Sequence, residues 1–349
     1  MDTKKNIFLK NKFWAIILVA QFSLFYILSK IDFAVDFFSH LFEWKKNFHV
    51  LLFSKFGFSV GDVIYTIVSL YLVFAIISLI RKKKSETLKQ LVIFINVTYF
   101  IYQCFWGMLY FQTPIIKKLP KKDITEQDLK NLTIKYLALC KETREQVSED
   151  KRGIFVINDL KKIEMEILSQ QRNLPRNITS KNSVEILSVK PSLYNQAMNY
   201  TGILGYYNPF TTESQFNPNL PSTQLPFTLA HEMSHQLGFA REQEASFIAF
   251  LCAKNSENQD LKYSIQLYVL KSLLRNLSIK EESFVKSILS NYSDKMKKDR
   301  NNELEFLKNH ESVLADVFGF TNDLFLKSNQ QDGSITYSYF ITLVALYES

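Results

Sequence analysis

Two histidines and a glutamate stand at a spacing that suits metal chemistry in the segment Pro226–Gly238. Residues 231–235 read His-Glu-Met-Ser-His, which is the pattern His-Glu-x-x-His. On a helix, side chains four residues apart lie on one face, so the imidazoles of His231 and His235 can bind one metal ion. Glu232 can then take a proton from a metal-bound water. This pattern is typical of zinc hydrolases, in which the two histidines are ligands and the glutamate is the general base.

The neighbouring residues favour a helix that ends soon after the second histidine. Pro226 suits the first turn of a helix, where its missing N–H is no loss. Leu229, Met233 and Leu237 form an apolar stripe that would bury the helix. Gly238 is a natural place for the helix to end and the chain to turn. Both histidines are therefore expected on a buried helix that stops at about residue 237.

A zinc site needs at least a third protein ligand, and Glu242 and Glu244 are the candidates. If the helix continued without a break, Glu242 would lie about 10 Å beyond His235 along the axis. That is too far for a Zn–O bond of about 2.0–2.2 Å. We therefore expect the chain to turn at Gly238 and a second helix to bring one glutamate back to the histidines.

The segment after this turn resembles the second helix of glutamate zincins, a class of zinc metallopeptidases. In that class a ligand Glu is followed three residues later by Ala and then by Asp or Asn. Glu242, Ala245 and Ser246 stand at these positions. The resemblance implies that Glu242 is the third ligand, and Glu244 remains the alternative. The glutamate that is not a ligand is expected to be solvated or paired with Arg241. Ser246 departs from the pattern, which has Asp or Asn at this position. As a consequence, its hydroxyl would be a weaker acceptor for a ligand histidine than a carboxylate.

A wider block resembles a bacterial family of membrane-anchored proteins known as domain of unknown function 3810. The matching residues are Gly205–Phe210, the Pro226-Phe227 pair before the first helix, and His231–Phe247. The resemblance extends loosely over the whole chain. It implies a zinc peptidase, with Zn²⁺ as the cofactor, but it points to no particular substrate.

Charge divides the chain at about residue 122. Residues 1–122 contain 17 Lys and Arg against 6 Asp and Glu, a net charge of +11. The remaining residues contain 25 basic and 28 acidic side chains, a net charge of −3. The positive charge of the whole chain therefore belongs to its first third, and it does not indicate nucleic-acid binding by the rest.

The first third predicts three transmembrane helices, at about 13–30, 62–80 and 90–111. Each run approaches the roughly 20 apolar residues that cross about 30 Å of hydrocarbon. The first run lacks the small-residue cleavage site of a signal peptide, so we expect an uncleaved anchor. Phe33–Phe58 is expected to lie along the membrane surface. Residues 1–116 are thus predicted to be a membrane anchor.

Basic residues predict which side of the membrane each part occupies. Lys4, Lys5, Lys10 and Lys12 precede the first run, and four basic residues at 81–84 separate the second from the third. Positive residues favour the cytoplasmic side, so three crossings place everything after Phe111 outside. Four lysines at 117–122 oppose this orientation. We expect a multi-pass protein of the cytoplasmic (inner) membrane with its catalytic domain on the extracytoplasmic side.

We expect residues 117–349 to form one zincin-like catalytic domain of the α+β type. The chain as a whole is expected to be mainly α with a small β element. Helices are expected at about 125–146, 157–171, 245–255, 260–275, 279–297, 302–327 and 335–347. The region 172–225 is rich in Asn, Pro, Ser and Thr. Its short runs Val184–Leu187 and Gly205–Tyr207 suit strands beside the metal helix, where an edge strand can pair with a peptide.

Peptide hydrolysis also benefits from a group that stabilises the oxyanion, and Tyr206, Tyr207, Asn208 and Tyr337 are candidates by their chemistry. The sequence predicts a membrane-anchored zinc metallopeptidase, a hydrolase in which Glu232 activates a zinc-bound water. Its expected partners are a peptide or protein substrate and the lipid bilayer, with no nucleic acid. The alternative is a membrane-tethered, non-catalytic binding or assembly protein on a zincin scaffold with a structural metal.

Overall fold

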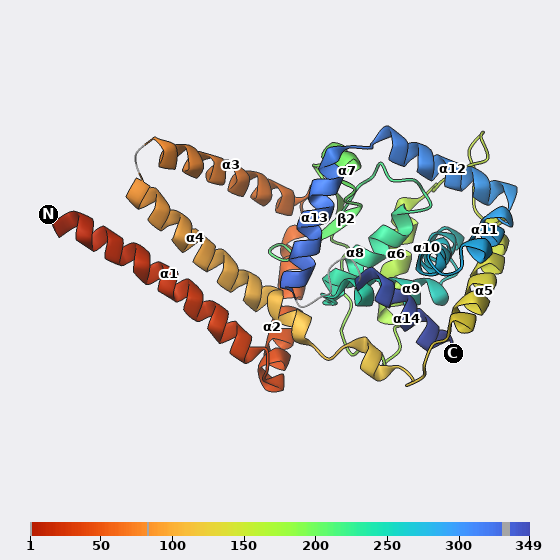
Figure 1. Cartoon of the computed structure of the whole chain (residues 1–349), viewed down its shortest axis with the longest axis horizontal. Coiled ribbons are helices and arrows are strands. Elements are labelled where there is room, and N and C mark those ends of the chain that lie inside the picture. The colour runs from red at the N-terminus through yellow and green to blue at the C-terminus, as the bar shows by residue number, and fades with distance from the viewer. Residues whose placement is uncertain (1, 82–83, 330–335) are drawn as a thin grey trace. The chain divides into compact units, whose positions relative to one another are not determined.

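The chain forms two compact units in a computed structural model, which describes residues 2–81, 84–329 and 336–349. Unit 1 comprises Met1–Gln112 and Asn208–Glu213. Unit 2 comprises Thr113–Tyr207 and Ser214–Ser349. Figure 1 shows that most of the described chain is helical. The fold is therefore mainly α with a small β element, as the sequence predicts.

Unit 1 is built from long helices that are rich in apolar residues (Figure 1). They are α1 Asp2–Leu28, α2 Asp32–Phe53, α3 Val60–Ile80 and α4 Lys84–Phe105, followed by the short 3-10 helix η1 Gly107–Phe111. Helix α4 packs against α1, α2 and α3. A small buried core of Phe25, Val35, Phe38 and Met108 joins α1, α2 and η1.

Two segments of unit 1 are long and apolar enough to cross a membrane by themselves, Val60–Ile80 and Glu86–Phe105. The first helix meets this criterion only together with the next one, as the pair Lys12–Leu28 and Asp32–Phe53, which is bent by 104°. The third run expected from the sequence, at about 90–111, divides between α4 and η1. These helices indicate that the protein associates with a membrane.

The loop Asn208–Glu213 is held within unit 1 by α2 and α3. The buried carboxylate of Glu213 accepts the backbone N–H groups of Val60 at 3.2 Å and Gly61 at 2.6 Å. These N–H groups belong to the first turn of α3, where the helix dipole stabilises a negative charge. Lys45 Nζ donates to the carbonyl oxygen of Pro209 at 2.6 Å. Helices α2 and α3 thereby anchor a loop that is distant from them in sequence.

Unit 2 combines helices with one three-stranded sheet. The helices that precede α8 are η2 Ile115–Lys118, α5 Glu126–Arg144, α6 Leu160–Arg172 and α7 Asn195–Thr201. The strands are β1 Val189–Pro191, β2 Gly205–Asn208 and β3 Glu213–Phe216, in the order β1-β3-β2. Strand β1 runs parallel to β3, with Val189 opposite Ser214. The remaining helices are α8 Leu225–Leu237, α9 Glu242–Lys254, α10 Gln259–Leu277, α11 Glu282–Ser290, α12 Asp294–Asn309, α13 Val313–Ser328 and α14 Thr336–Glu348.

Helices α8 and α9 form the centre of unit 2. All 13 residues of α8 are buried, and α9 is buried from Glu244 to Ala253. Helices α6 and α10 pack against both, and α14 packs against α9 and α10. Ser264 of α10 holds the start of α8, because its hydroxyl accepts the N–H of Phe227 at 3.1 Å and donates to the carbonyl of Thr223 at 2.7 Å. Side chains on these two helices are therefore held by packing from several directions.

The observed start of α5 agrees with the helix expected at about residue 125, whereas two of the later helices expected from the sequence are divided. Thr125 and Asp128 form a capping box at the start of α5. The expected helices at 279–297 and 302–327 are wrong, because the chain instead breaks at 291–293 and 310–312.

Serine side chains explain both of these breaks. The hydroxyl of Ser293 accepts the N–H of Met296, and that of Ser312 accepts the N–H of Leu314. Each serine therefore begins a new helix. The expected strand at Val184–Leu187 is also wrong, because the residues that pair with β3 are those of β1.

Candidate metal centre

A turn at Gly238 connects α8 to α9, as the sequence predicts. Gly238 has a φ of 105°, a left-handed conformation that glycine adopts with little strain. Its N–H donates to the carbonyl of His235 at 2.8 Å, and the N–H of Phe239 donates to the carbonyl of Ser234 at 3.2 Å. Helix α9 then begins at Glu242. The glutamate therefore returns toward α8 in the first turn of the second helix.

His231, His235 and Glu242 come together at this turn. Nε2 of His231 lies 3.1 Å from Nε2 of His235 and 3.1 Å from Oε2 of Glu242, and Nε2 of His235 lies 3.5 Å from Oε1 of Glu242. Two ligands at about 2.0–2.1 Å from a tetrahedral centre lie about 3.3 Å apart. Among the side chains that the structure describes, these three form a group able to hold a metal ion. Two imidazole nitrogens and a carboxylate are a donor set that suits zinc.

Both imidazoles are oriented through their other ring nitrogen. Nδ1 of His235 lies 2.7 Å from the carbonyl oxygen of Phe239, which can only accept, so Nδ1 carries a proton and Nε2 is the nitrogen that faces the cluster. Nδ1 of His231 lies 3.1 Å from Oγ of Ser246. Ser246 thus stands where the glutamate-zincin pattern has Asp or Asn. Such contacts fix the ring and the tautomer of a ligand histidine.

Glu232 lies against strand β2. A Cβ atom placed on Gly205 would come within 2.7 Å of Cγ and 2.9 Å of Oε1 of Glu232, so only glycine fits beside this side chain. Ser214 Oγ donates to the backbone carbonyl of Glu232 at 2.9 Å. Within the described part of the chain, Oε2 of Glu232 is buried and has no hydrogen-bond partner. A buried carboxylate oxygen without a donor is costly and is a usual sign of a functional group.

The electrostatics of the cluster follow from burial and from the short distances between charges. Burial raises the pKa of Glu232 to about 8 and lowers the pKa of His231. Burial also acts to lower the pKa of His235, but the adjacent Glu242 carboxylate raises it to about 9. Burial opposes ionisation of Glu242, yet His235 and His231 hold its pKa well below the usual range. These shifts favour a negatively charged Glu242 carboxylate next to a positive charge at the two histidines.

Glu244, the alternative third ligand, contacts other groups. Its Oε1 accepts the backbone N–H of Ile115 at 2.8 Å and lies 3.2 Å from Nη1 of Arg241. Its carboxylate therefore joins the start of α9 to η2. The pairing with Arg241 is the role that the sequence suggests for the glutamate that is not a ligand.

The four oxyanion candidates lie in different surroundings. The ring of Tyr207 lies 6.4 Å from that of His235, whereas the hydroxyl of Tyr206 lies 2.8 Å from Oγ of Ser192. Asn208 belongs to the loop in unit 1, where its Oδ1 accepts the N–H groups of residues 210 and 211. The side chain of Tyr337 lies outside the described residues. Tyr207 is the candidate whose position beside a histidine of the cluster is described.

Sequence reasoning misses three features of this centre. The hydroxyl of Tyr268, on α10, contacts Ser246, and burial raises its pKa. The carbonyl of Phe239 orients His235, and Gly205 makes room for Glu232. None has a motif-like spacing from the histidines, so the sequence carries no signal for them. Only the glycine stands in a block that the family resemblance singles out.

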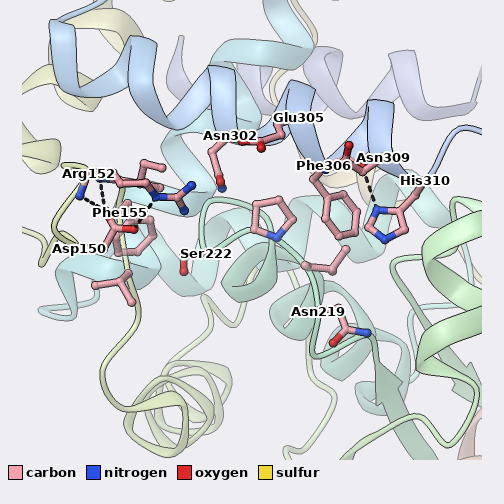
Figure 2. A pocket seen from close by; sticks show the side chains of 14 residues that line it. Asp150, Arg152, Phe155, Asn219, Ser222, Asn302, Glu305, Phe306, Asn309 and His310 are labelled. Atoms are coloured by element: carbon pink, nitrogen blue, oxygen red, sulfur yellow. Dashed lines mark hydrogen bonds and ion pairs between the residues drawn. The ribbon is translucent and has the colours of Figure 1, made fainter.

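A separate pocket of about 410 Å³ lies beside α12 (Figure 2). Its lining includes Arg152, Phe155, Asn302, Phe306 and His310, and none of the metal-centre residues contributes to it. Within the pocket, Arg152 pairs with an aspartate two residues earlier, and Nδ1 of His310 bonds to the carbonyl of Phe306 at 2.8 Å. His310, which ends α12, therefore takes no part in the cluster at His231.

The fold and this site together define a mainly helical, membrane-associated protein in which a turn between two buried helices gathers two histidines and a glutamate. Residues 37–345 match the model of the family described as Protein of unknown function (DUF3810). Because the match covers most of the 349 residues, the chain belongs to this family. No curated protein and no solved structure matches the chain.

Proposed function

We propose that this protein is a membrane-anchored, zinc-dependent metallopeptidase. His231, His235 and Glu242 hold the metal, and Glu232 is the general base. The observation that carries the proposal is the spacing of the three donor atoms, 3.1, 3.1 and 3.5 Å, which is close to that of ligands around one tetrahedral centre. Oε2 of Glu232, on the same helix as the two histidines, is buried without a hydrogen-bond partner among the described residues. This supports a catalytic role for the site in addition to metal binding.

The chemistry divides between the metal and the residues around it. A bound Zn²⁺ supplies a Lewis acid for the substrate carbonyl and makes a water molecule more acidic. Glu232 accepts a proton from the water whose oxygen forms the new bond to the carbonyl carbon. As the C–N bond breaks, the same carboxylic acid returns this proton to the leaving nitrogen. Tyr207, beside His235, is the candidate donor to the oxyanion.

Strand β2 gives the substrate a place to bind. It is an edge strand, because the sheet order is β1-β3-β2. Gly205 of this strand touches Glu232, so a peptide paired with β2 would pass beside the general base. An extended peptide backbone is therefore the substrate class that this arrangement favours.

Glu232→Gln separates catalysis from metal binding. An amide of the same shape accepts a proton poorly, so the variant should keep its zinc and lose at least about 100-fold in peptide cleavage. Full-length protein in detergent would be analysed for zinc and incubated with a peptide library, with products identified by mass spectrometry. Glu282→Gln, on an exposed side chain of α11, is the matched control.

Each other outcome has a definite meaning. Wild-type protein without zinc under metal-replete conditions would refute the metal centre. Zinc in the wild type without cleavage of any peptide would instead favour the alternative, a membrane-tethered binding or assembly protein with a structural metal.

The same proposal includes an orientation. We place the protein in the cytoplasmic (inner) membrane as a multi-pass protein, with His231 on the extracytoplasmic side, because basic residues flank the apolar runs at 4–12 and 81–84. Exported proteins and envelope peptides would then be its substrates. A reporter active only outside the cytoplasm, fused after Ser349, is expected to be active. Activity of a cytoplasm-only reporter at that position would reverse the orientation.

A further inference from the structure

Helix α13 exposes an unusual number of large apolar side chains. Six of them are between 41 and 78 % exposed: Val313, Leu314, Val317, Phe318, Phe320 and Leu324. Single exposed apolar residues are common on protein surfaces, but a contiguous group marks an interaction site. Nothing in this observation depends on the metal centre.

The exposed residues form one face of the helix. Val313, Val317, Phe320 and Leu324 recur at intervals of four, three and four residues, which places them along one stripe. Leu314 and Phe318 continue the stripe on one side. Asp316, Asn322 and Asp323 lie away from it on the helical wheel. Helix α13 is therefore amphipathic, with its apolar face open.

The neighbouring element extends the apolar surface. Helix α13 packs against α7 (Figure 1), and Ser312 Oγ donates to the carbonyl of Tyr200 at 2.8 Å. The side chains of Leu193, Tyr200 and Leu204, around α7, are themselves exposed. Tyrosine is enriched at membrane–water interfaces, where its ring contacts lipid and its hydroxyl contacts water. The exposed surface thus covers two elements of unit 2.

We propose that α13 lies in the membrane–water interface, with its apolar face against the lipid acyl chains. The same chain carries two helices long and apolar enough to span a bilayer, so the protein that carries α13 is itself expected at a membrane. At 16 residues, α13 is about 24 Å long and too short to span about 30 Å of hydrocarbon, and it carries Asp316, Asp323 and Lys327. A short amphipathic helix of this kind lies along the surface rather than across it.

The charges of α13 predict how it binds. Two aspartates and one lysine give the helix a net charge of −1, so anionic lipid offers it no attraction. Binding should therefore come from apolar area alone. It should be the same in phosphatidylcholine as in a bilayer with added phosphatidylglycerol.

Spin labels on opposite faces of α13 test the proposal. Phe320→Cys and Val317→Cys place a nitroxide on the apolar face, and Asn322→Cys is the matched control on the polar face. The parent carries Cys104→Ala, because Cys140 and Cys252 are fully buried and Cys104 is not. Full-length protein in phosphatidylcholine nanodiscs would be compared for accessibility to oxygen, which enriches in lipid, and to a water-soluble nickel complex.

The oxygen-to-nickel accessibility ratio should be several-fold higher at positions 317 and 320 than at position 322, and unchanged by phosphatidylglycerol. Equal access of the nickel complex to all three labels would overturn the proposal. Labels at 317 and 320 that neither reagent reaches would also overturn it, because protein, such as a second copy of the chain, would then cover this face. A thermal melt of each variant confirms that the comparison is made on folded protein.

Discussion

Unit 2 buries two clusters of ionisable side chains, and their polar atoms are satisfied in opposite ways. In the first, Arg144 and Asp299 are both fully buried and lie 2.6 Å apart. Asp299 also accepts the hydroxyl of Tyr263 at 2.7 Å and the N–H of Phe155 at 2.8 Å. Arg144 donates further to the carbonyl of Gly153 at 2.9 Å. This cluster contains its own counter-charge and its own donors.

The second cluster, His231, His235 and Glu242, pairs its carboxylate with both imidazoles, but it also brings together atoms that suit a metal ion. Two ring nitrogens that both suit metal ligation face each other at 3.1 Å, and Oε2 of the nearby Glu232 has no partner among the described residues. A fully satisfied buried network rigidifies a fold, whereas an incompletely satisfied one is costly unless a bound ligand completes it. Burial of charge alone therefore does not mark a functional site. Buried donors and acceptors that lack a partner are the better sign of one.

The largest expected effect separates the two neighbouring glutamates. Glu242→Gln removes a charged ligand of the proposed zinc site and should weaken zinc affinity by more than the roughly 100-fold seen for changes outside the ligand shell. Glu244→Gln should leave zinc affinity near wild type, because that carboxylate contacts Ile115 and Arg241. Competition with a chromophoric chelator measures both. The reverse ranking would transfer the third-ligand role to Glu244.

Asp299→Ala tests the cluster of Arg144 and Asp299 and should lower the stability of the fold. It removes the buried carboxylate closest to Arg144, which costs about 3–5 kcal/mol and lowers the melting temperature by roughly 10 °C. Thermal unfolding in detergent measures the shift, and Asp294→Ala, an exposed aspartate on the same helix, should change it little. Zinc bound per folded molecule should stay unchanged. If Asp299→Ala instead melted at the normal temperature and lost its zinc, the two clusters would not differ in the way described above.

The smallest effect concerns the residue that orients His231. Ser246→Ala removes the partner of Nδ1, so zinc affinity should fall about tenfold. Ser246→Asp supplies a stronger acceptor and should preserve or tighten binding. Ser234→Ala is the control, because that buried hydroxyl donates to the carbonyl of Ala230 on its own helix. Equal affinities for all three variants would show that Ser246 does not orient the ligand.

Much of the centre could be predicted from local sequence. The interval between His231 and His235 equals about one helical turn, so any helix here puts both rings on one face. Gly238 allows a left-handed φ that stops the helix, and Pro226 suits its start. Runs of apolar residues likewise predict membrane helices, because length and composition alone decide whether a helix can cross hydrocarbon. These features depend on residues that are close in the chain.

Only the tertiary structure decided which side chains of α9 face the histidines, because this depends on the direction in which α9 leaves the turn at Gly238. Glu242 and Glu244 are both possible ligands by sequence, and only the path of the chain after Gly238 turns the first toward the histidines and the second toward η2. The approach of Gly205 to Glu232 and the contact of Tyr268 with Ser246 likewise join segments far apart in sequence. No periodicity encodes such contacts. The sequence alone determined the spacing of residues that the proposed zinc chemistry requires, and packing between distant segments determined which side chains are placed to carry it out.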